Sequence, residues 1–140
     1  MSKILITQLL KIPNKNGDIY HGLNRLEDEY AGFGEAYFSF ISPGSVKAWK
    51  RHLHMTMNLI VPIGKVKFVF FNPKIVGVET FEVFEIGEKN YSRITVPPGV
   101  WFGFQGIHAS SSLVLNIASI PHDPNEVQRK EQIEFEYRWT

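Results

Sequence analysis

Residues 44–58 have the sequence Gly-Ser-Val-Lys-Ala-Trp-Lys-Arg-His-Leu-His-Met-Thr-Met-Asn, and this stretch decides the fold that we predict. Side chains of a β-strand alternate between its two faces. In an extended strand, one face here is polar at five successive positions, which are Lys50, His52, His54, Thr56 and Asn58. The opposite face is mostly apolar, as in a core or a subunit interface. We therefore expect the polar face to line a pocket inside a small β-barrel.

A second segment, residues 96–105, has the sequence Val-Pro-Pro-Gly-Val-Trp-Phe-Gly-Phe-Gln. It predicts a tight turn, in which Gly99 takes a backbone angle that other residues avoid, followed by an aromatic strand. Phe102 and Phe104 share one face of that strand, where they pack in the core or stack on a sugar or base. Gln105 could hydrogen-bond the same ligand or lie exposed. Asn116, which lies in an apolar strand, needs a partner in the core or the pocket.

The composition and the spacing of turns predict one all-β domain over residues 1–140. Eleven Phe, five Tyr and three Trp are many for 140 residues, and aromatic side chains favour strands. Short strands separated by Gly and Pro are typical of a sandwich or a barrel. Strands are expected over 3–11, 35–41, 46–62, 66–71, 80–86, 91–96, 100–107, 112–118 and 133–139, with a turn at Asn72-Pro73. Short helices are expected over 22–30, capped by Asn24, and after the loop at 121–126.

The charge balance and the missing residue types argue against several classes of protein. Fifteen Lys and Arg against fourteen Asp and Glu give no general electrostatic affinity for nucleic acid. There is no cysteine, so neither disulfides nor a Cys nucleophile can occur. No segment resembles a signal peptide or approaches the length of a membrane span, so we expect a cytoplasmic protein without a membrane partner.

The two histidines of the polar strand allow more than one chemistry. His52 and His54 project in parallel and could hold one metal ion or one anion, but a metal site needs three or four ligands. Asn58 is a poor ligand, so no metal and no other cofactor is expected. A histidine near its ordinary pKa suits proton transfer, and an enclosed Lys50 would lower that pKa. The alternative is that one or both histidines are hydrogen-bonded polar residues on an accessible face.

Over residues 35–126 the order of motifs resembles the RmlC-like cupins, which include the dTDP-4-dehydrorhamnose 3,5-epimerases. The family segment Ser-Pro-Gly-(Val)-x-Arg-Gly-Leu-His is similar to Ser42-Pro-Gly-Ser-Val-Lys-Ala-Trp-Lys-Arg-His52. A family strand that ends in Gly is similar to residues 58–64. The family segment Ile-Pro-Pro-Gly-Phe-Ala-His-Gly-Phe is similar to residues 96–104, and Tyr-x-Pro-x-x-Glu is similar to His122-Asp-Pro-Asn-Glu126. The resemblance implies a cupin, or double-stranded β-helix (jelly-roll), barrel with one or two short helices, and a homodimer.

The family's epimerases resemble one another in a catalytic His base, a Lys that steadies an enolate and a Tyr acid. In this sequence, the usual catalytic residues are not retained at the matching positions. Aligning Ala48-Trp49 with the family's Gly-Leu places Lys50 at the base position, whereas a shift of two residues places His52 there. The Lys position falls near Met57 and the Tyr position near Leu115. The metal-cupin pattern also departs, because Asn58 and Phe102 stand where it has Glu and His.

The leading hypothesis is an epimerase or isomerase-like protein that acts on a nucleotide-linked keto-sugar, of the dTDP-sugar type, in surface-polysaccharide biosynthesis. His52 or His54 would be the base, and Lys50 or Arg51 would hold an enolate or a phosphate. Candidate substrate-binding residues are Arg51, Asn58, Phe102, Phe104, Gln105 and Asn116. The alternatives are a non-catalytic sugar-nucleotide-binding cupin and, third, a metal-dependent cupin enzyme.

Overall fold

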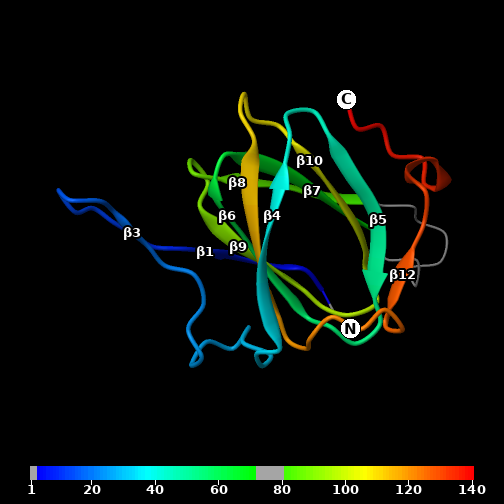
Figure 1. Cartoon of the computed structure of the whole chain (residues 1–140), viewed down its shortest axis with the longest axis horizontal. Coiled ribbons are helices and arrows are strands. Elements are labelled where there is room, and N and C mark those ends of the chain that lie inside the picture. Colours follow the sequence, from blue (N-terminus) through cyan, green and yellow to red (C-terminus); the bar gives the residue numbers. More distant parts are fainter. Residues whose placement is uncertain (1–2, 72–80) are drawn as a thin grey trace.

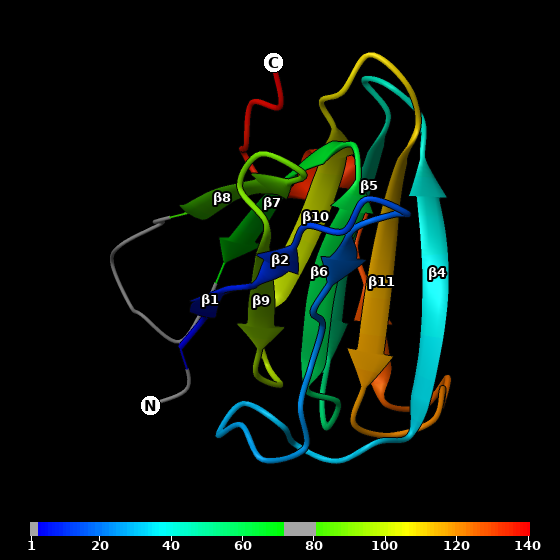
Figure 2. The same ribbon diagram turned by 90° about the vertical axis from the view of Figure 1, so that its left-hand side faces the viewer.

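The computed structural model describes residues 3–71 and 81–140, and these form a barrel of two facing antiparallel sheets (Figure 1). The strands are β1 (Leu5–Gln8), β2 (Lys11–Ile12), β3 (Ile19–Tyr20), β4 (Glu35–Ile41), β5 (Val46–His52), β6 (Met57–Ile63), β7 (Lys65–Phe71), β8 (Phe81–Gly87), β9 (Ser92–Val96), β10 (Trp101–Gly106), β11 (Ser112–Ala118) and β12 (Val127–Arg129). The first sheet has the order β1-β9-β6-β11-β4 and the second has the order β12-β5-β10-β7-β8. The β2-β3 ribbon forms an arm that projects from the barrel (Figures 1 and 2).

The core lies between the two sheets, where alternate residues of each strand meet. On β7, Val66, Phe68 and Phe70 belong to this core, whereas Val69 is buried in a second cluster. The strand predicted over 66–71 to be buried on both faces is therefore confirmed. Predicted strands 35–41, 91–96, 100–107 and 112–118 also match β4, β9, β10 and β11. The strand predicted over 80–86 corresponds to β8, while its first residue and the turn predicted at 72–73 lie outside the described residues.

The run predicted as one strand over 46–62 is two strands, β5 and β6, which belong to opposite sheets. The chain turns at residues 53–56, where the Glu126 carboxylate accepts hydrogen bonds from the backbone N–H of His54 and Met55, at 3.1 and 3.2 Å. Gly99 has a φ of +89°, as expected, and its N–H donates to the His52 carbonyl at 2.7 Å. The predicted five-residue polar face therefore ends at His52.

The C-terminal segment covers the outer face of the second sheet. The strand predicted over 133–139 is wrong, since the chain forms a short 3₁₀ helix, η1 (Gln132–Glu134), and then extends without a sheet partner among the described residues. Phe135, Tyr137 and Trp139 still alternate as in a strand, and all three pack around Trp49. At Gly103 a Cβ would come within 2.6 Å of the Ala48 Cβ, so glycine permits this close packing.

Part of the outer face of the first sheet is covered by residues 21–33. The helix predicted over 22–30 does not form, although Asn24 makes the expected cap, since its side chain accepts from the Leu26 N–H at 2.9 Å. The buried guanidinium of Arg93 on β9 instead holds the segment as turns, because it binds Glu27 at 2.7 Å and Glu29 at 3.0 Å. A buried charge needs such partners, and satisfying them outweighs a weak helix propensity.

Two further findings concern the helices. Within residues 3–71 and 81–140, η1 is the only helix, so the one or two short helices expected reduce to a single 3₁₀ turn. Over the same residues, no helix has the length and apolar character needed to cross a bilayer.

Candidate functional site

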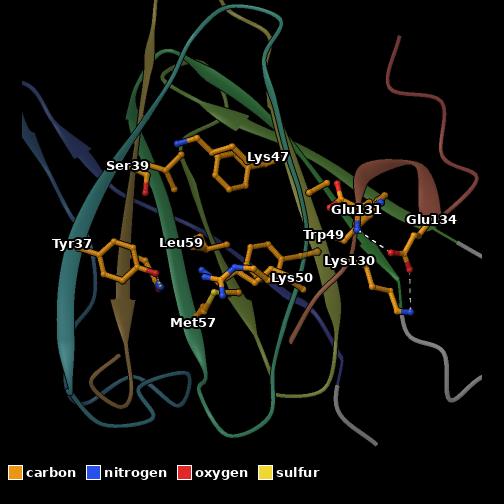
Figure 3. Close-up of a pocket in the computed structure, with 16 residues that line it drawn as sticks. Tyr37, Ser39, Lys47, Trp49, Lys50, Met57, Leu59, Lys130, Glu131 and Glu134 are labelled. Carbon is orange, nitrogen blue, oxygen red and sulfur yellow. Dashed lines mark hydrogen bonds and ion pairs between the residues drawn. The ribbon is translucent and has the colours of Figure 1, made fainter. Parts of the chain in front are cut away.

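A cavity of about 630 Å³ opens between the two sheets (Figure 3). This volume falls in the range of small-molecule sites. One wall comes from β4, β6 and β11 of the first sheet, and the other from β5, β10 and β12 with η1 at the rim. The lining residues are Tyr37, Ser39, Lys47, Ala48, Trp49, Lys50, Met57, Leu59, Phe102, Phe104, Val114, Asn116, Arg129, Lys130, Glu131 and Glu134.

Two lysines of β5 line the cavity because the strand contains a bulge. In the pairing of β5 with β10, Lys50 lies opposite Phe102 and Ala48 lies opposite Gly103, so Trp49 is skipped. A bulge shifts the alternation by one residue. Lys47 and Lys50, three positions apart, therefore both line the cavity. Lys47 also reaches across to the first sheet, where its Nζ donates to the Phe40 carbonyl at 2.8 Å.

Lys50 and Arg129 concentrate positive charge on the second-sheet wall. They are register partners on β5 and β12, so their side chains share a face. Within the described part of the chain neither forms an ion pair with a carboxylate. Burial, and then the charge of Arg129, lower the pKa of Lys50 from its ordinary value of 10.5. The cavity therefore presents a fixed cation beside an amine that loses its proton more easily than usual.

Tyr37 lies on the opposite wall from Lys50 (Figure 3). It is the register partner of Asn116 on β11, and the Asn116 Nδ2 donates to the Tyr37 hydroxyl at 3.0 Å. Because the hydroxyl oxygen accepts this bond, its own O–H is left to donate elsewhere. The buried Asn116 Oδ1 has no hydrogen-bond partner among the described residues. The wall thus offers an oriented phenol and an unsatisfied amide oxygen.

His52 lies two residues beyond Lys50 on the same strand but is buried and does not line the cavity. Its Nδ1 is hydrogen-bonded to the Glu126 carboxylate, and its ring lies parallel to that of Phe102 with the centroids 6.1 Å apart. Burial lowers the pKa of His52 below 6.5, against the opposing effect of Glu126. Burial would raise the pKa of Glu126, yet the hydrogen bonds from His52 and from the His54 and Met55 amides lower it overall. The pair is thus a neutral imidazole on a carboxylate, and the buried Nε2 has no partner among the residues described.

Four of the predicted site residues lie together at the cavity, namely Lys50, Phe102, Phe104 and Asn116. His54, exposed in the β5-β6 turn, lies outside the cavity.

Three other predicted residues also lie away from the cavity. Arg51 packs on the outer face, with its guanidinium 4.8 Å from the Trp101 ring centroid. Asn58 faces away from the lumen, where its Oδ1 accepts from the Thr95 hydroxyl at 2.6 Å. Gln105 donates to the Gly44 carbonyl at 3.2 Å. The turn at 53–56 and the strand alternation explain these positions.

Sequence reasoning missed most of the cavity residues, among them Tyr37, Lys47 and Arg129. Tyr37 carried a usable signal, because it and Ser39 are polar-tipped residues that alternate with Phe38 and Phe40 on β4. Lys47 carried none, since the bulge at Trp49 depends on pairing with β10. Arg129 carried little signal, because the strand that contains it, β12, is only three residues long and such a short strand shows no clear alternation.

Within the described ranges, no three His, Cys, Asp or Glu side chains are grouped so that they could hold a metal ion. The groups that the cavity offers for proton transfer and hydrogen bonding include the Lys50 amine, the Tyr37 phenol, the Arg129 guanidinium and the Asn116 amide.

Comparisons with known proteins agree with this architecture. No protein-family model matches the chain. The probable low-salt glycan biosynthesis epimerase Agl13 of Haloferax volcanii is 32% identical over 100 residues, which are 69% of this chain and 64% of that protein. The chain thus spans less than two thirds of the length of that curated relative.

Two solved structures extend the comparison to the fold. The dTDP-sugar isomerase from Desulfovibrio desulfuricans G20 is 34% identical, with a TM-score of 0.88 over 94% of this chain and 85% of that one. The dTDP-4-dehydrorhamnose 3,5-epimerase from Sulfolobus tokodaii is 17% identical, with a TM-score of 0.78 over 96% of this chain and 80% of that one. The fold and the cavity define a cupin-type barrel, as predicted. The chain belongs to the RmlC-like cupin family of dTDP-sugar epimerases and isomerases.

Proposed function

We propose that this protein inverts a carbon centre next to the keto group of a dTDP-linked keto-sugar. The observation that carries the proposal is an amine of lowered pKa, Lys50, facing a phenol, Tyr37, across a cavity that fits a small molecule. Two proton-transfer groups on opposite walls suit removal of a proton from one side of a carbon and its return from the other. Membership of the family and the names of the relatives support the substrate class.

Lys50 is the proposed base. Its neutral amine takes the proton from the carbon beside the carbonyl, and the C–H electron pair moves toward the carbonyl oxygen to form an enolate. The guanidinium of Arg129 beside Lys50 stabilises that negative charge, as a preorganised cation does in a partly enclosed site. The alignment of Ala48-Trp49 with the family's Gly-Leu gives Lys50 the base position as well.

Tyr37 is the proposed acid. Its hydroxyl, oriented by Asn116, donates a proton to the opposite side of the enolate carbon. The family's tyrosine position falls near Leu115, next to Asn116, and Asn116 pairs with Tyr37. In this proposal the phenol has moved to the neighbouring strand, while Asn116 fixes its position.

The remaining cavity residues would hold the nucleotide. Lys47 and Arg129 provide cations for a diphosphate. Phe102 and Phe104 provide faces on which a sugar or a base can stack. Asn116 Oδ1 lacks a partner among the described residues and could accept from a sugar hydroxyl.

The test is solvent exchange. The protein is incubated in D₂O with dTDP-4-keto-6-deoxyglucose, and proton NMR follows deuterium incorporation beside the keto group. We expect incorporation by the wild type and a loss of about 10²–10⁴-fold in Lys50→Ala, the usual contribution of a general base. Lys50→His serves as the matched variant, because it restores a base at this position and should recover part of the rate.

His52 is the rival base, because its Nε2 lacks a partner and its Nδ1 is held by Glu126. His52→Gln answers this question in the same assay. If His52→Gln abolishes exchange in a folded protein while Lys50→Ala retains it, the base is His52 and the assignment of Lys50 is wrong.

A non-catalytic sugar-nucleotide-binding cupin is the second candidate, favoured by the departures from the family's His, Lys and Tyr pattern that the sequence alignment with Gly-Leu at Ala48-Trp49 implies. Calorimetric binding of dTDP without any deuterium incorporation would establish it.

We further propose that residues 1–140 act as one cupin domain in the cytoplasm, in surface-polysaccharide biosynthesis. As the resemblance implies, we expect a homodimer.

A further inference from the structure

Residues 130–139, which we call the C-terminal strap, follow β12 and pack around Trp49 of β5. Only 1% of Trp49 is exposed. The centroid of its ring lies 5.3 Å from that of Phe135 and 5.3 Å from that of Trp139. The Trp49 Nε1 also donates to the Gln132 carbonyl at 3.1 Å. The strap therefore encloses this side chain on the outer side of the second sheet.

The strap also satisfies the backbone of the bulge in β5. Trp49 is the residue that the pairing of β5 with β10 skips, because Ala48 and Lys50 lie opposite consecutive residues of β10. The extra residue of a bulge has no partner of its own on that neighbouring strand. The Trp49 N–H donates to the Lys130 carbonyl at 2.9 Å, and the Lys130 N–H donates to the Trp49 carbonyl at 3.0 Å. The strap thus supplies both backbone hydrogen bonds of the extra residue.

The end of the strap packs on the strand that faces the bulge. A Cβ at Gly103 of β10 would come within 3.1 Å of two atoms of the Trp139 ring, so this ring lies on the position where the register shifts. Lys67 of β7 holds the end of the strap, because its Nζ donates to the Trp139 carbonyl at 2.8 Å. The same Nζ lies 5.7 Å from the centroid of the Trp139 ring. The strap therefore contacts three strands of the second sheet around the bulge.

The bulge determines which lysines reach the cavity. Lys47 and Lys50 are three positions apart, and residues at that spacing point to opposite faces of a regular strand. With the bulge, both line the cavity. Lys130, Glu131 and Glu134 of the strap line the same cavity (Figure 3). A regular β5 would leave only one of the two β5 lysines there.

We propose that the C-terminal strap is a positioning element of the site, which holds Trp49 and thereby keeps Lys47 and Lys50 together in the cavity. The roles of the two lysines rest on the proposed function, whereas their placement is a property of the protein without ligand. Trp139 is the residue to test, because its ring contacts both Trp49 and β10. Trp139 does not line the cavity, so it is a positioning residue and not a catalytic one.

The titration of Lys50 tests the inference without any ligand. Carbon-13 NMR of labelled lysine Cε atoms follows this titration, and Lys50→Arg assigns the resonance. Burial, Arg129 and Lys47 lower the pKa of Lys50, whereas Glu126 raises it. We expect Trp139→Ala to raise the pKa of Lys50 toward 10.5, because either Lys47 moves away from Lys50 or Lys50 itself moves into water. An unchanged titration in a folded Trp139→Ala would overturn the inference.

Three further variants make this titration specific. Trp139→Phe keeps an aromatic ring against Trp49 and should retain most of the wild-type titration. Phe84→Ala is the matched control, because this half-buried ring packs against the core between the sheets, and its loss should leave the pKa of Lys50 unchanged. A rise as large in Phe84→Ala as in Trp139→Ala would mean a general loosening and would refute the role of the strap. If Trp139→Ala does not fold, Lys67→Met replaces it, since it removes the bond to the Trp139 carbonyl. A smaller rise in the pKa of Lys50 is then expected, and no rise would refute the inference.

Calorimetric titration with dTDP tests the consequence for the site. We expect Trp139→Ala to bind dTDP about tenfold more weakly than Phe84→Ala does, as for the loss of one charged hydrogen bond to the diphosphate. Equal affinities would show that both lysines stay in the cavity without the strap, and would contradict the inference. A wild type that does not bind dTDP would count against the proposed function, and the titration of Lys50 would still decide the role of the strap.

Discussion

Lys50 and His52 lie two residues apart on the same face of β5, yet they are in different environments. Lys50 lines the cavity beside Arg129, whereas His52 is buried against Phe102 and bonded to Glu126. Burial lowers the pKa of both side chains, and the consequences differ. A cavity lysine with an easily lost proton can serve as a base. The buried His52 imidazole is instead hydrogen-bonded to the Glu126 carboxylate, and this bond joins the end of β5 to the C-terminal region.

The largest expected effect concerns the hydrogen bond that holds His52, the buried residue of this pair. Glu126→Ala leaves the neutral His52 imidazole and two backbone amides without their acceptor, and each donor left unsatisfied costs about 1–3 kcal/mol, so we expect a loss of about 3–5 kcal/mol of unfolding free energy. Lys50→Ala should change the unfolding free energy by less than about 1 kcal/mol, because this half-buried cavity side chain forms no ion pair with the described residues. Urea denaturation followed by tryptophan fluorescence measures both. Equal losses of unfolding free energy in the two variants would contradict the assignment of a structural role to the His52–Glu126 pair and not to Lys50.

The second prediction concerns the wall opposite Lys50. Tyr37→Phe keeps the ring and removes the proposed acid, so we expect the inverted sugar to form about 10²-fold more slowly. Deuterium incorporation should persist, because Lys50 still removes the proton and exchanges it with solvent. Asn116→Asp is a useful companion, since a carboxylate cannot donate the bond that now orients Tyr37. If Tyr37→Phe forms the inverted product at the wild-type rate, Tyr37 is not the acid.

The dependence of thermal stability on pH should distinguish the contributions of His52 and Glu126. The pKa of His52 is lower in the folded state than its ordinary 6.5, so the unfolded chain binds the proton more readily. We therefore expect the thermal midpoint to fall as the pH drops below about 6.5 toward the folded pKa of His52. The lowered pKa of Glu126 adds a further fall below about 4.5. Calorimetric scans of His52→Gln should lack the first of these declines, and an unchanged profile would contradict the assignment.

The smallest expected effect is a shift in the pH dependence of exchange. The rate should rise with pH as Lys50 loses its proton, with a midpoint below the ordinary lysine pKa of 10.5. Arg129 contributes to lowering that pKa, so Arg129→Gln should move the rising limb to higher pH. The direction of the shift is diagnostic, because a movement to lower pH would show that another group controls the rate.

The alternation of single strands was predictable, because it depends only on local geometry. The pattern of residues 66–71 predicted a strand buried on both faces, and Pro97-Pro98-Gly99 predicted the turn that Gly99 makes with a positive φ. The motif order from 35 to 126 predicted the cupin barrel. Lys50, Phe102, Phe104 and Asn116 were named from these patterns and lie together at the cavity.

What the patterns could not supply depends on contacts between distant segments. The Glu126 carboxylate, more than 70 residues along the chain, holds the turn that separates β5 from β6 and removes His54 and Asn58 from the predicted polar face. Arg93 holds residues 21–33 as turns where local capping suggested a helix.

The sequence by itself determined most of the strands, the kind of barrel they build and the strand that carries the site. Tertiary structure alone decided that the bulge at Trp49 adds Lys47 to the cavity, that Tyr37 faces Lys50 and that His52 lies buried behind it. The physical reason is that strand periodicity is a local property, whereas depth, register and pKa depend on which distant strands pack together.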